Sequence, residues 1–244
     1  MILIQKSAPP SGLLELKKDA EAQGLSDTEG YKKLGNPLKS EVRDQLMREQ
    51  GHLCAYCMRE IPDVRVMADN PESSGAFIEH WMARSADNPT PENKGLDYFN
   101  MLAVCSGNEK APEANGGKKK RFLTCDRKRK NIALKINPLD AATLETLSYT
   151  PDGKIKSSDS VIERDIDSTL NLNCDSSAVR LPQSRKEALD AIQESIFNEC
   201  KDEDYLQKCT EYLHLFEEES DPKTPYSGIV IWWLKDQIRA MSEI

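Results

Sequence analysis

The chain has 244 residues, of which 38% are hydrophobic and 30% are charged, a composition that is ordinary for a globular protein with enough residues to bury a core. Its formal net charge of −8 argues against a protein that coats nucleic acid without specificity, because affinity for phosphate backbones comes mostly from Lys and Arg. The sequence contains no run of about 18 apolar residues, and its apolar start, Met1–Ile4, is too short for a signal sequence, so we expect a cytoplasmic protein with no membrane partner.

Residues 1–36 are predicted to form an N-terminal arm. A short apolar start is followed by a polar helical stretch from Leu13 to Gln23, and such a start stays ordered only when it docks on another surface. A second helix is predicted from Pro37, with Ser40 as its N-cap and an apolar stripe on one face. This helix leads directly into the first cysteine.

The middle of the chain is predicted to be a small mixed unit. Residues 54–67 have the pattern of a turn followed by a strand, and Ala76–Trp81 has the pattern of a second short strand. Two strands joined by a loop would bring Glu79 and His80 near the first cysteines. A short helix is predicted over Arg127–Leu134, ending before an Asn-Pro pair.

Beyond residue 140 the pattern changes. Pro151-Asp152-Gly153 lies between apolar flanks and predicts a hairpin, helical periodicity covers Gln183–Phe216, and the terminal stretch Ile229–Met241 is apolar. We therefore predict an α+β protein with three parts: an arm (1–36), a core (37–140) and a hairpin with a mainly helical module (141–244).

Four cysteines predict a metal site in the core. Cys54 and Cys57 form one CxxC pair, and Cys105 and Cys125 supply two further thiols. Zn²⁺ takes thiolate ligands in a tetrahedral array, and a chain in a reducing compartment has little use for disulfides. A lone CxxC would also suit a redox site or a buried apolar pair, but the set of four favours structural zinc. The other three cysteines are taken as ordinary thiols.

A short basic segment lies between and after the last two of these cysteines. Its members are Lys118, Lys119, Lys120, Arg121, Arg127, Lys128, Arg129 and Lys130. The segment predicts a local basic face on an acidic protein, which suits contact with nucleic acid. The alternative is a solvated loop without a partner.

Glu79-His80 is the pair best suited to chemistry. Cleavage of a phosphodiester bond needs an activated water and a cation, and histidine is the natural base near neutral pH while carboxylates hold Mg²⁺. Successive side chains of a strand point to opposite faces, so both residues serve one site only where the strand is distorted or the metal lies at its edge. The alternative is a histidine satisfied in the core or at the surface.

The ordered set Cys54-x-x-Cys57, Glu79-His80, Asn100 and Cys105 resembles the zinc-containing HNH endonucleases of ββα-metal type. The resemblance implies a ββα-metal core with structural zinc that hydrolyses nucleic acid. It implies that Glu79 binds a catalytic divalent ion, that His80 is the general base, and that Asn100 braces the histidine-bearing loop. Candidate substrate-binding residues are Arg84, Lys118, Lys119 and Lys128, and a solvated surface arginine is the alternative for Arg84.

The fourth cysteine departs from the family pattern, which places it where this chain has Asn108. We therefore expect residues 106–124 to be an insertion and Cys125 to replace the missing thiol. Asp126 then takes the position of the second ligand of the catalytic ion, and a carboxylate there would suit Mg²⁺ or Mn²⁺. Asn108 and Asn131 are the competing candidates for this ligand.

A narrower resemblance is to the HNH subunits, called PtuB, of Septu-type antiphage defence and related retron systems. It is carried by Ile78-Glu79-His80-Trp81, Leu96-Asp97-Tyr98-Phe99-Asn100, Cys125-Asp126, Leu170-Asn171-Leu172-Asn173 and Arg180. It implies an ABC-type ATPase partner (PtuA-like) that restrains or directs the nuclease, and a DNA or RNA target. Without this resemblance, the alternating Leu-Asn segment predicts a strand with one wet face.

A second hypothesis is a noncatalytic zinc module that binds nucleic acid or a protein partner through its basic segment. Exposure of His80 beside a second, non-thiol metal position would favour the enzyme. Burial of His80 with hydrogen bonds to backbone alone would favour the binding module.

Overall fold

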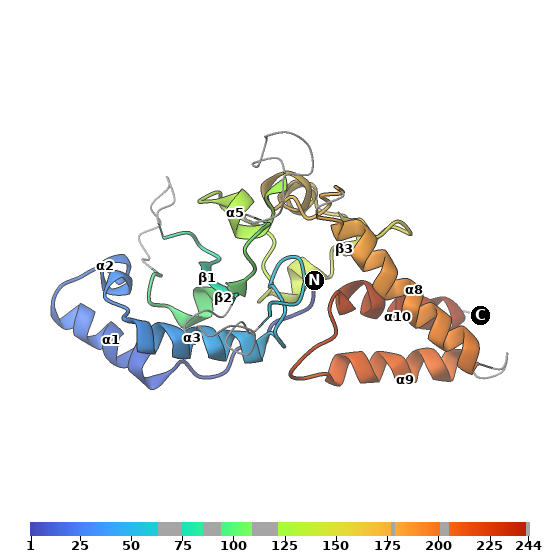
Figure 1. Ribbon diagram of the computed structural model, residues 1–244, viewed down its shortest axis with the longest axis horizontal. Helices are drawn as coiled ribbons and strands as arrows, with labels where there is room; N and C mark the ends of the chain where they lie inside the picture. The colour runs from blue at the N-terminus through green and yellow to red at the C-terminus, as the bar shows by residue number, and fades with distance from the viewer. Residues whose placement is uncertain (63–74, 85–93, 109–121, 177–178, 201–204, 243–244) are drawn as a thin grey trace.

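The protein combines helices with two small antiparallel sheets (Figure 1). The structure is a computed structural model, and it describes residues 1–62, 75–84, 94–108, 122–176, 179–200 and 205–242. The mixed helix and sheet content agrees with the predicted class. In Figure 1 the N-terminal helices and the first sheet lie at one end, and the C-terminal helices lie at the other.

The N-terminal arm consists of an extended start and two helices, α1 (Ser11–Ala22) and α2 (Asp27–Lys32). The start crosses the middle of the molecule, where the Ile4 backbone N–H donates to the Pro138 carbonyl at 2.9 Å. A capping box begins α2, because Ser26 and Glu29 each bond the other's backbone N–H. The apolar start is therefore docked on the chain itself.

Helix α3 (Asn36–Glu49) lies beside the first sheet and buries Val42, Leu46 and Met47. The predicted cap is wrong. The N-cap is Gly35, and Ser40 lies inside the helix, because Pro37 with its fixed φ fits the first turn and needs no N–H partner there.

The first sheet pairs β1 (Phe77–His80) with β2 (Met101–Val104). The register places Glu79 opposite Leu102 and His80 opposite Met101, and a 3-10 turn, η1 (Tyr98–Asn100), leads into β2. The strand predicted within residues 54–67 falls largely outside the described residues. Strand β1 pairs instead with the chain that leads to the third cysteine.

Helix α5 (Cys125–Arg129) follows β2 in the described part of the chain and gives the order strand, strand, helix. It begins and ends earlier than the predicted Arg127–Leu134, because Lys130 takes φ 59° and breaks the helix there. Cys125 itself has φ 53°, and its backbone N–H donates to the Leu170 carbonyl at 2.8 Å.

The predicted hairpin is present as β3 (Leu147–Tyr149) and β4 (Ile155–Ser157), framed by α6 (Ala141–Leu144), α7 (Ser160–Arg164) and a π-helical turn, η3 (Asp165–Thr169). The predicted Leu-Asn strand is wrong. Asn171 has φ 54° and donates to the Leu123 carbonyl at 2.9 Å, while Asn173 bonds the backbone of Ile155. Asn171 thus supports the chain before the fourth cysteine, and Asn173 supports β4.

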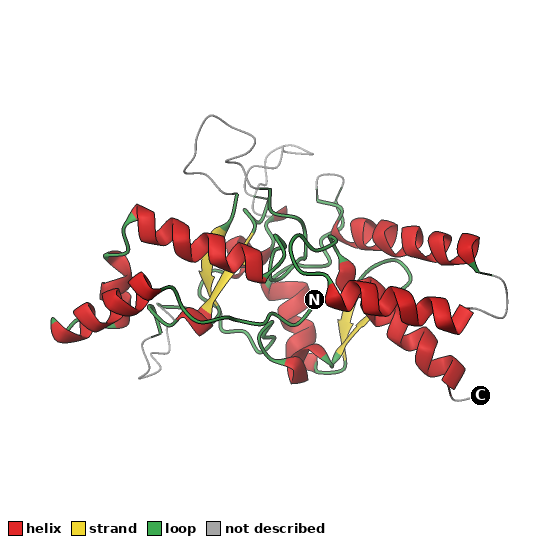
Figure 2. Ribbon diagram, turned by 90° about the horizontal axis from the view of Figure 1, so that it is seen from below, coloured by secondary structure: helices red, strands yellow, loops and turns green. Residues whose placement is uncertain are grey.

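The C-terminal part contains α8 (Leu181–Glu199), α9 (Tyr205–Glu218) and α10 (Ser227–Ser242) (Figure 2). Periodicity over Gln183–Phe216 predicts the first two, and α10 forms from the apolar terminal stretch. Helix α10 packs against α9, α8 and β3. Its buried residues Ile229, Val230 and Leu234 provide the packing face.

Candidate metal centre and adjoining acid-histidine site

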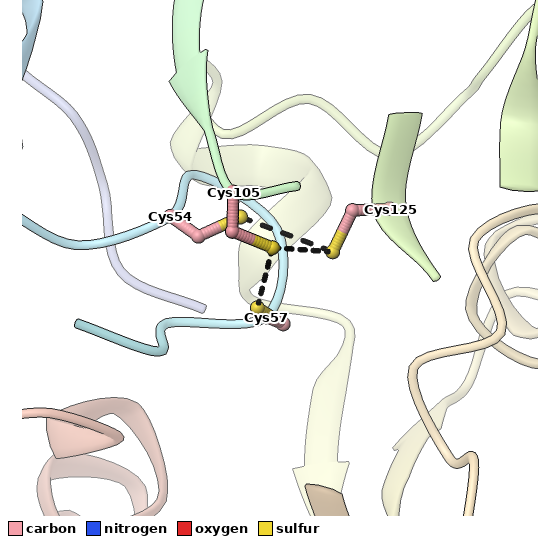
Figure 3. A group of neighbouring side chains, drawn as sticks. All are labelled: Cys54, Cys57, Cys105 and Cys125. Carbon is pink, nitrogen blue, oxygen red and sulfur yellow. Dashed lines mark hydrogen bonds between the residues drawn. The ribbon is translucent and has the colours of Figure 1, made fainter. Parts of the chain in front are cut away.

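Four cysteine side chains converge in the interior (Figure 3). Cys54 and Cys57 come from the turn after α3, Cys105 follows β2, and Cys125 begins α5. All four are buried, and their sulfur atoms lie within 4.8 Å of one another. Three of the Sγ–Sγ distances are 3.8 Å, and a tetrahedron with Zn–S bonds of about 2.3 Å has edges of about 3.8 Å. The four residues can therefore hold a metal ion, and their spacing is compatible with zinc.

Tight turns shape this cluster. The Cys54 backbone N–H donates to the Arg59 carbonyl at 2.9 Å, and the Met58 N–H donates to the Cys54 carbonyl at 2.9 Å. The Gly107 N–H donates to the Cys105 sulfur at 3.4 Å. A Cβ atom on Gly107 would lie 2.4 Å from the Thr124 carbonyl oxygen, so the chain after β2 needs glycine at this position.

Hydrogen bonds join the two ends of the expected insertion between Cys105 and Cys125. The Thr124 N–H donates to the Gly107 carbonyl at 3.0 Å, and the Asn108 amide donates to Thr124 Oγ1 at 2.9 Å. Asn108 Oδ1 accepts from Arg59 at 2.6 Å. The Asn108 amide is therefore occupied by bonds that hold the two ends of the insertion together.

Two guanidinium groups, the half-buried Arg59 and the buried Arg185, place positive charge near the cysteines. Burial lowers the pKa of Arg59, but the charge of Cys57 and a hydrogen bond to Tyr226 raise it overall. Burial lowers the pKa of Arg185, and the charges of Cys57 and Cys125 oppose that shift. Within the described residues, Nη1 of Arg185 has no hydrogen-bond partner. Such cations would offset the charge of a tetrathiolate metal site, which is doubly negative with zinc.

Glu79 and Asp126 meet beside Arg129. Arg129 is fully buried, and its Nη1 donates to Glu79 Oε1, to the His80 carbonyl at 3.1 Å and to the Tyr56 hydroxyl at 3.3 Å. Burial raises the pKa of Glu79 to about 8; Arg129 opposes this shift, and the charge and hydrogen bond of Asp126 reinforce it. Two carboxyl groups within hydrogen-bond reach of one another hold either a shared proton or a further cation.

His80 lies at the end of β1 and is 5% exposed. Its Nε2 lies 3.0 Å from the Gly95 carbonyl oxygen. Because a carbonyl only accepts, Nε2 carries the proton and Nδ1 of the neutral ring carries the lone pair. Burial lowers the pKa of His80 to about 4; the Gly95 carbonyl opposes this shift, and Arg84 and Arg129 add to it. The ring is therefore neutral at pH 7.

Asn100 holds the backbone that follows His80. Its Oδ1 accepts from the Met82 N–H at 2.7 Å, and its Nδ2 donates to the carbonyls of Met82 at 3.0 Å and Lys94 at 3.1 Å. The Asn100 carbonyl also accepts from the Trp81 N–H at 2.9 Å. These bonds tie the loop after β1 to the chain that enters β2.

Two of the four candidate phosphate-binding residues lie within the described residues. Arg84 is exposed, with its Cζ 4.2 Å from the centre of the Tyr31 ring, and Lys128 is half-buried on α5. Lys118 and Lys119 lie outside the described residues. Asn131, a competing metal ligand, is exposed just beyond α5.

The sequence analysis missed two neighbours of the acid-histidine pair. Arg129 was counted in the basic face, and that placement is wrong, because the side chain is 0% exposed and faces Glu79. Tyr31 contacts His80 from α2, with ring centroids 4.7 Å apart. Nothing in the spacing of either residue distinguishes it from an ordinary helical one.

No protein-family model matches this chain, and no curated protein sequence matches it. Within the described part of the chain, no helix has the length and apolar content needed to cross a membrane.

Proposed function

We propose that the protein is an HNH-type endonuclease with a structural zinc and a catalytic divalent ion, and that it hydrolyses phosphodiester bonds. The observation that carries the proposal is the meeting of Glu79 and Asp126 at a strand, strand, helix unit tied together by four cysteines. His80, the residue after Glu79 at the end of the first strand, supplies a neutral imidazole.

Zinc has a structural role in this proposal. Four thiolates fill a tetrahedral coordination sphere, which leaves no open position for water or substrate. The ion would join the turn after α3, the end of β2 and the start of α5 and would add to the hydrogen bonds that already link them. Zinc binding is then part of the folding free energy.

Hydrolysis would begin with a water at Nδ1 of His80, which accepts its proton while Nε2 stays bonded to Gly95. Glu79 and Asp126 would hold Mg²⁺ or Mn²⁺, which supplies Lewis-acid stabilisation of the leaving oxygen. The Asn108 side chain is hydrogen-bonded to Arg59 and Thr124, which favours Asp126 over Asn108 as the second ligand of the catalytic ion.

Substrate would be held by the cations around the acid pair. Arg84 and Lys128 are the described candidates, and Lys118 and Lys119 belong to the insertion. Asn100 would keep His80 in place through the backbone of the next two residues. Each cation would neutralise phosphate charge on a protein that is acidic overall.

We extend the proposal to a two-component antiphage defence complex in the cytoplasm. The resemblance in Ile78–Trp81 and Leu96–Asn100 supports it, with an ABC-type ATPase subunit as the partner. The substrate is DNA or RNA, and the choice between them is left to the assay below.

Substitution of His80 tests the nuclease. We expect purified protein with Mg²⁺ or Mn²⁺ to cut supercoiled plasmid or single-stranded RNA, and His80→Ala to lose at least about a hundredfold in rate while keeping its zinc. His214→Ala, an exposed histidine on α9, is the matched control and should cut normally. Undiminished cutting by His80→Ala would rule out the proposed base.

A noncatalytic zinc module is the second candidate, and specific observations favour it. His80 is buried, and its hydrogen bond goes to the Gly95 backbone, while Glu79 pairs with Arg129. Glu79 and His80 face different neighbours, as expected for successive positions on a strand. Binding of DNA or RNA without cleavage in either metal would establish this candidate.

A further inference from the structure

The N-terminal arm reaches the acid-histidine site through Tyr31. The half-buried Tyr31 ring of α2 meets the His80 ring edge-on, at 4.7 Å between centroids and 86° between planes. The Arg84 guanidinium lies over the same Tyr31 ring, with Cζ 4.2 Å from its centre. One aromatic side chain from outside the strand, strand, helix unit therefore contacts both the proposed base and a proposed phosphate ligand.

Backbone packing fixes α2 against the loop before η1. The Leu96 N–H donates to Asp27 Oδ2 at 3.3 Å. A Cβ atom on Gly95 would lie 2.7 Å from the Asp27 carbonyl oxygen, and one on Gly30 would lie 2.6 Å from a methyl carbon of Leu96. The close approach needs glycine on both sides. Because Gly95 also bonds His80, the position of Tyr31 relative to the imidazole is set by the fold and not by a flexible tail.

We propose that Tyr31 is a positioning residue that holds the Arg84 guanidinium ready for a backbone phosphate of bound nucleic acid beside His80. This inference rests on the proposed function. Stacking uses the flat face of the guanidinium and leaves its N–H donors free at the edge, where they can form a bidentate pair with phosphate. Without the ring, an exposed arginine loses more side-chain entropy when it binds.

The test measures binding by fluorescence anisotropy, with Ca²⁺ in place of Mg²⁺ to prevent cleavage. DNA and RNA oligonucleotides of one sequence are the probes, each titrated at several salt concentrations. Arg84→Gln should weaken binding about tenfold and reduce the slope of log affinity against log salt by about one phosphate contact. The probe with the larger loss identifies the nucleic acid that Arg84 contacts.

Tyr31→Leu changes no charge, yet it should lose most of the same affinity and flatten the same salt slope. A purely structural role would not change the slope. Tyr31→Phe keeps the ring and should bind normally, and the double variant Tyr31→Leu/Arg84→Gln should bind no more weakly than Arg84→Gln. Tyr212→Leu is the matched control, a half-buried tyrosine of α9, and should leave binding unchanged.

The inference would be overturned if either Tyr31→Leu or Arg84→Gln bound nucleic acid with normal affinity. It would also be overturned if the fold-losses in affinity of the two single variants multiplied in the double variant. If Tyr31→Leu fails to fold, Arg84→Lys replaces it, because lysine keeps the charge and loses the stacked planar fork; normal affinity of that variant would also overturn it. A wild-type protein that binds but never cuts would refute the nuclease and leave this result standing.

Discussion

Arg129→Met removes the charge beside the acid pair while keeping most of the side-chain volume. In the folded protein the Arg129 guanidinium donates to Glu79, to the Tyr56 hydroxyl and to backbone carbonyls that include those of His80 and Ile132. Methionine can fill the space and replaces none of these bonds. The variant therefore leaves a buried carboxylate and several buried acceptors without a donor.

The expected cost follows from the burial of this pair, since the Arg129 and Glu79 side chains are 0% and 9% exposed. Removing one partner of a buried ion pair costs about 3–5 kcal/mol. For a chain of this length, each kcal/mol lowers the melting temperature by about 2–4 °C, so we expect a fall of roughly 6–20 °C. Glu79→Gln added to Arg129→Met should recover part of the loss, because a neutral amide needs no counter-charge.

Urea unfolding of the zinc-loaded protein, followed by circular dichroism without Mg²⁺, measures these differences. The measurement is made at about pH 9, above the raised pKa of Glu79, so that its carboxyl group is ionised. Arg239→Met, which breaks an exposed pair with Asp236 on α10, is the control and should leave the free energy of unfolding nearly unchanged. A loss below about 1 kcal/mol for Arg129→Met, or strictly additive losses in the double variant, would refute the stabilising pair.

Three further predictions concern the metal sites and the loop brace. Cys125→Ala should reduce bound zinc, measured by atomic emission, from one ion per chain to none, and should unfold the core; retained zinc would exclude Cys125 as a ligand. The pKa of Glu79 is raised from 4.5 to about 8 in the folded protein, so between these pH values the folded state holds one more proton than the unfolded state. The free energy of unfolding of the wild type, relative to Glu79→Gln, should therefore fall as pH rises toward 8 in urea titrations. Asn100→Ala should cost about 1–3 kcal/mol of unfolding free energy, because it removes two hydrogen bonds to partly buried backbone groups of Met82. An unchanged urea midpoint would argue against the brace.

Local patterns predicted the parts of the fold whose cause is local. Turn residues at Pro151-Asp152-Gly153 and the periodicity over Gln183–Phe216 gave the hairpin and helices α8 and α9, because both signals depend on near neighbours. The error at Ser40 has a local cause too, since Pro37 and Ser40 compete to begin one helix. The strand predicted for the Leu-Asn segment was wrong for a nonlocal reason. Its asparagine amides bond the backbone of Leu123 and Ile155, and sequence spacing alone does not reveal these partners.

At the metal centre and the acid-histidine site, too, residues with a local sequence signal were predicted and residues placed by tertiary packing were not. The four cysteines were found from spacing because zinc needs a fixed set of soft ligands, and the structure brings them together. Arg129 was misplaced because lysine and arginine runs usually face solvent, and burial of one member depends on the position of β1. Tyr31 was missed because only tertiary packing brings α2 to His80.

Arg129 and a divalent ion need not exclude each other at Glu79. A carboxylate has two oxygens, and Arg129 takes Oε1, which leaves Oε2 with its own lone pairs. Arg129 also bonds the His80 and Trp81 carbonyls, so it would stay in place when a cation replaces the proton of Glu79. The ion pair with Arg129 would therefore orient Oε1 of Glu79 and leave Oε2 for the metal ion. Mn²⁺ should then bind the wild-type protein with release of about one proton per ion near pH 7, and binding without proton release would contradict it.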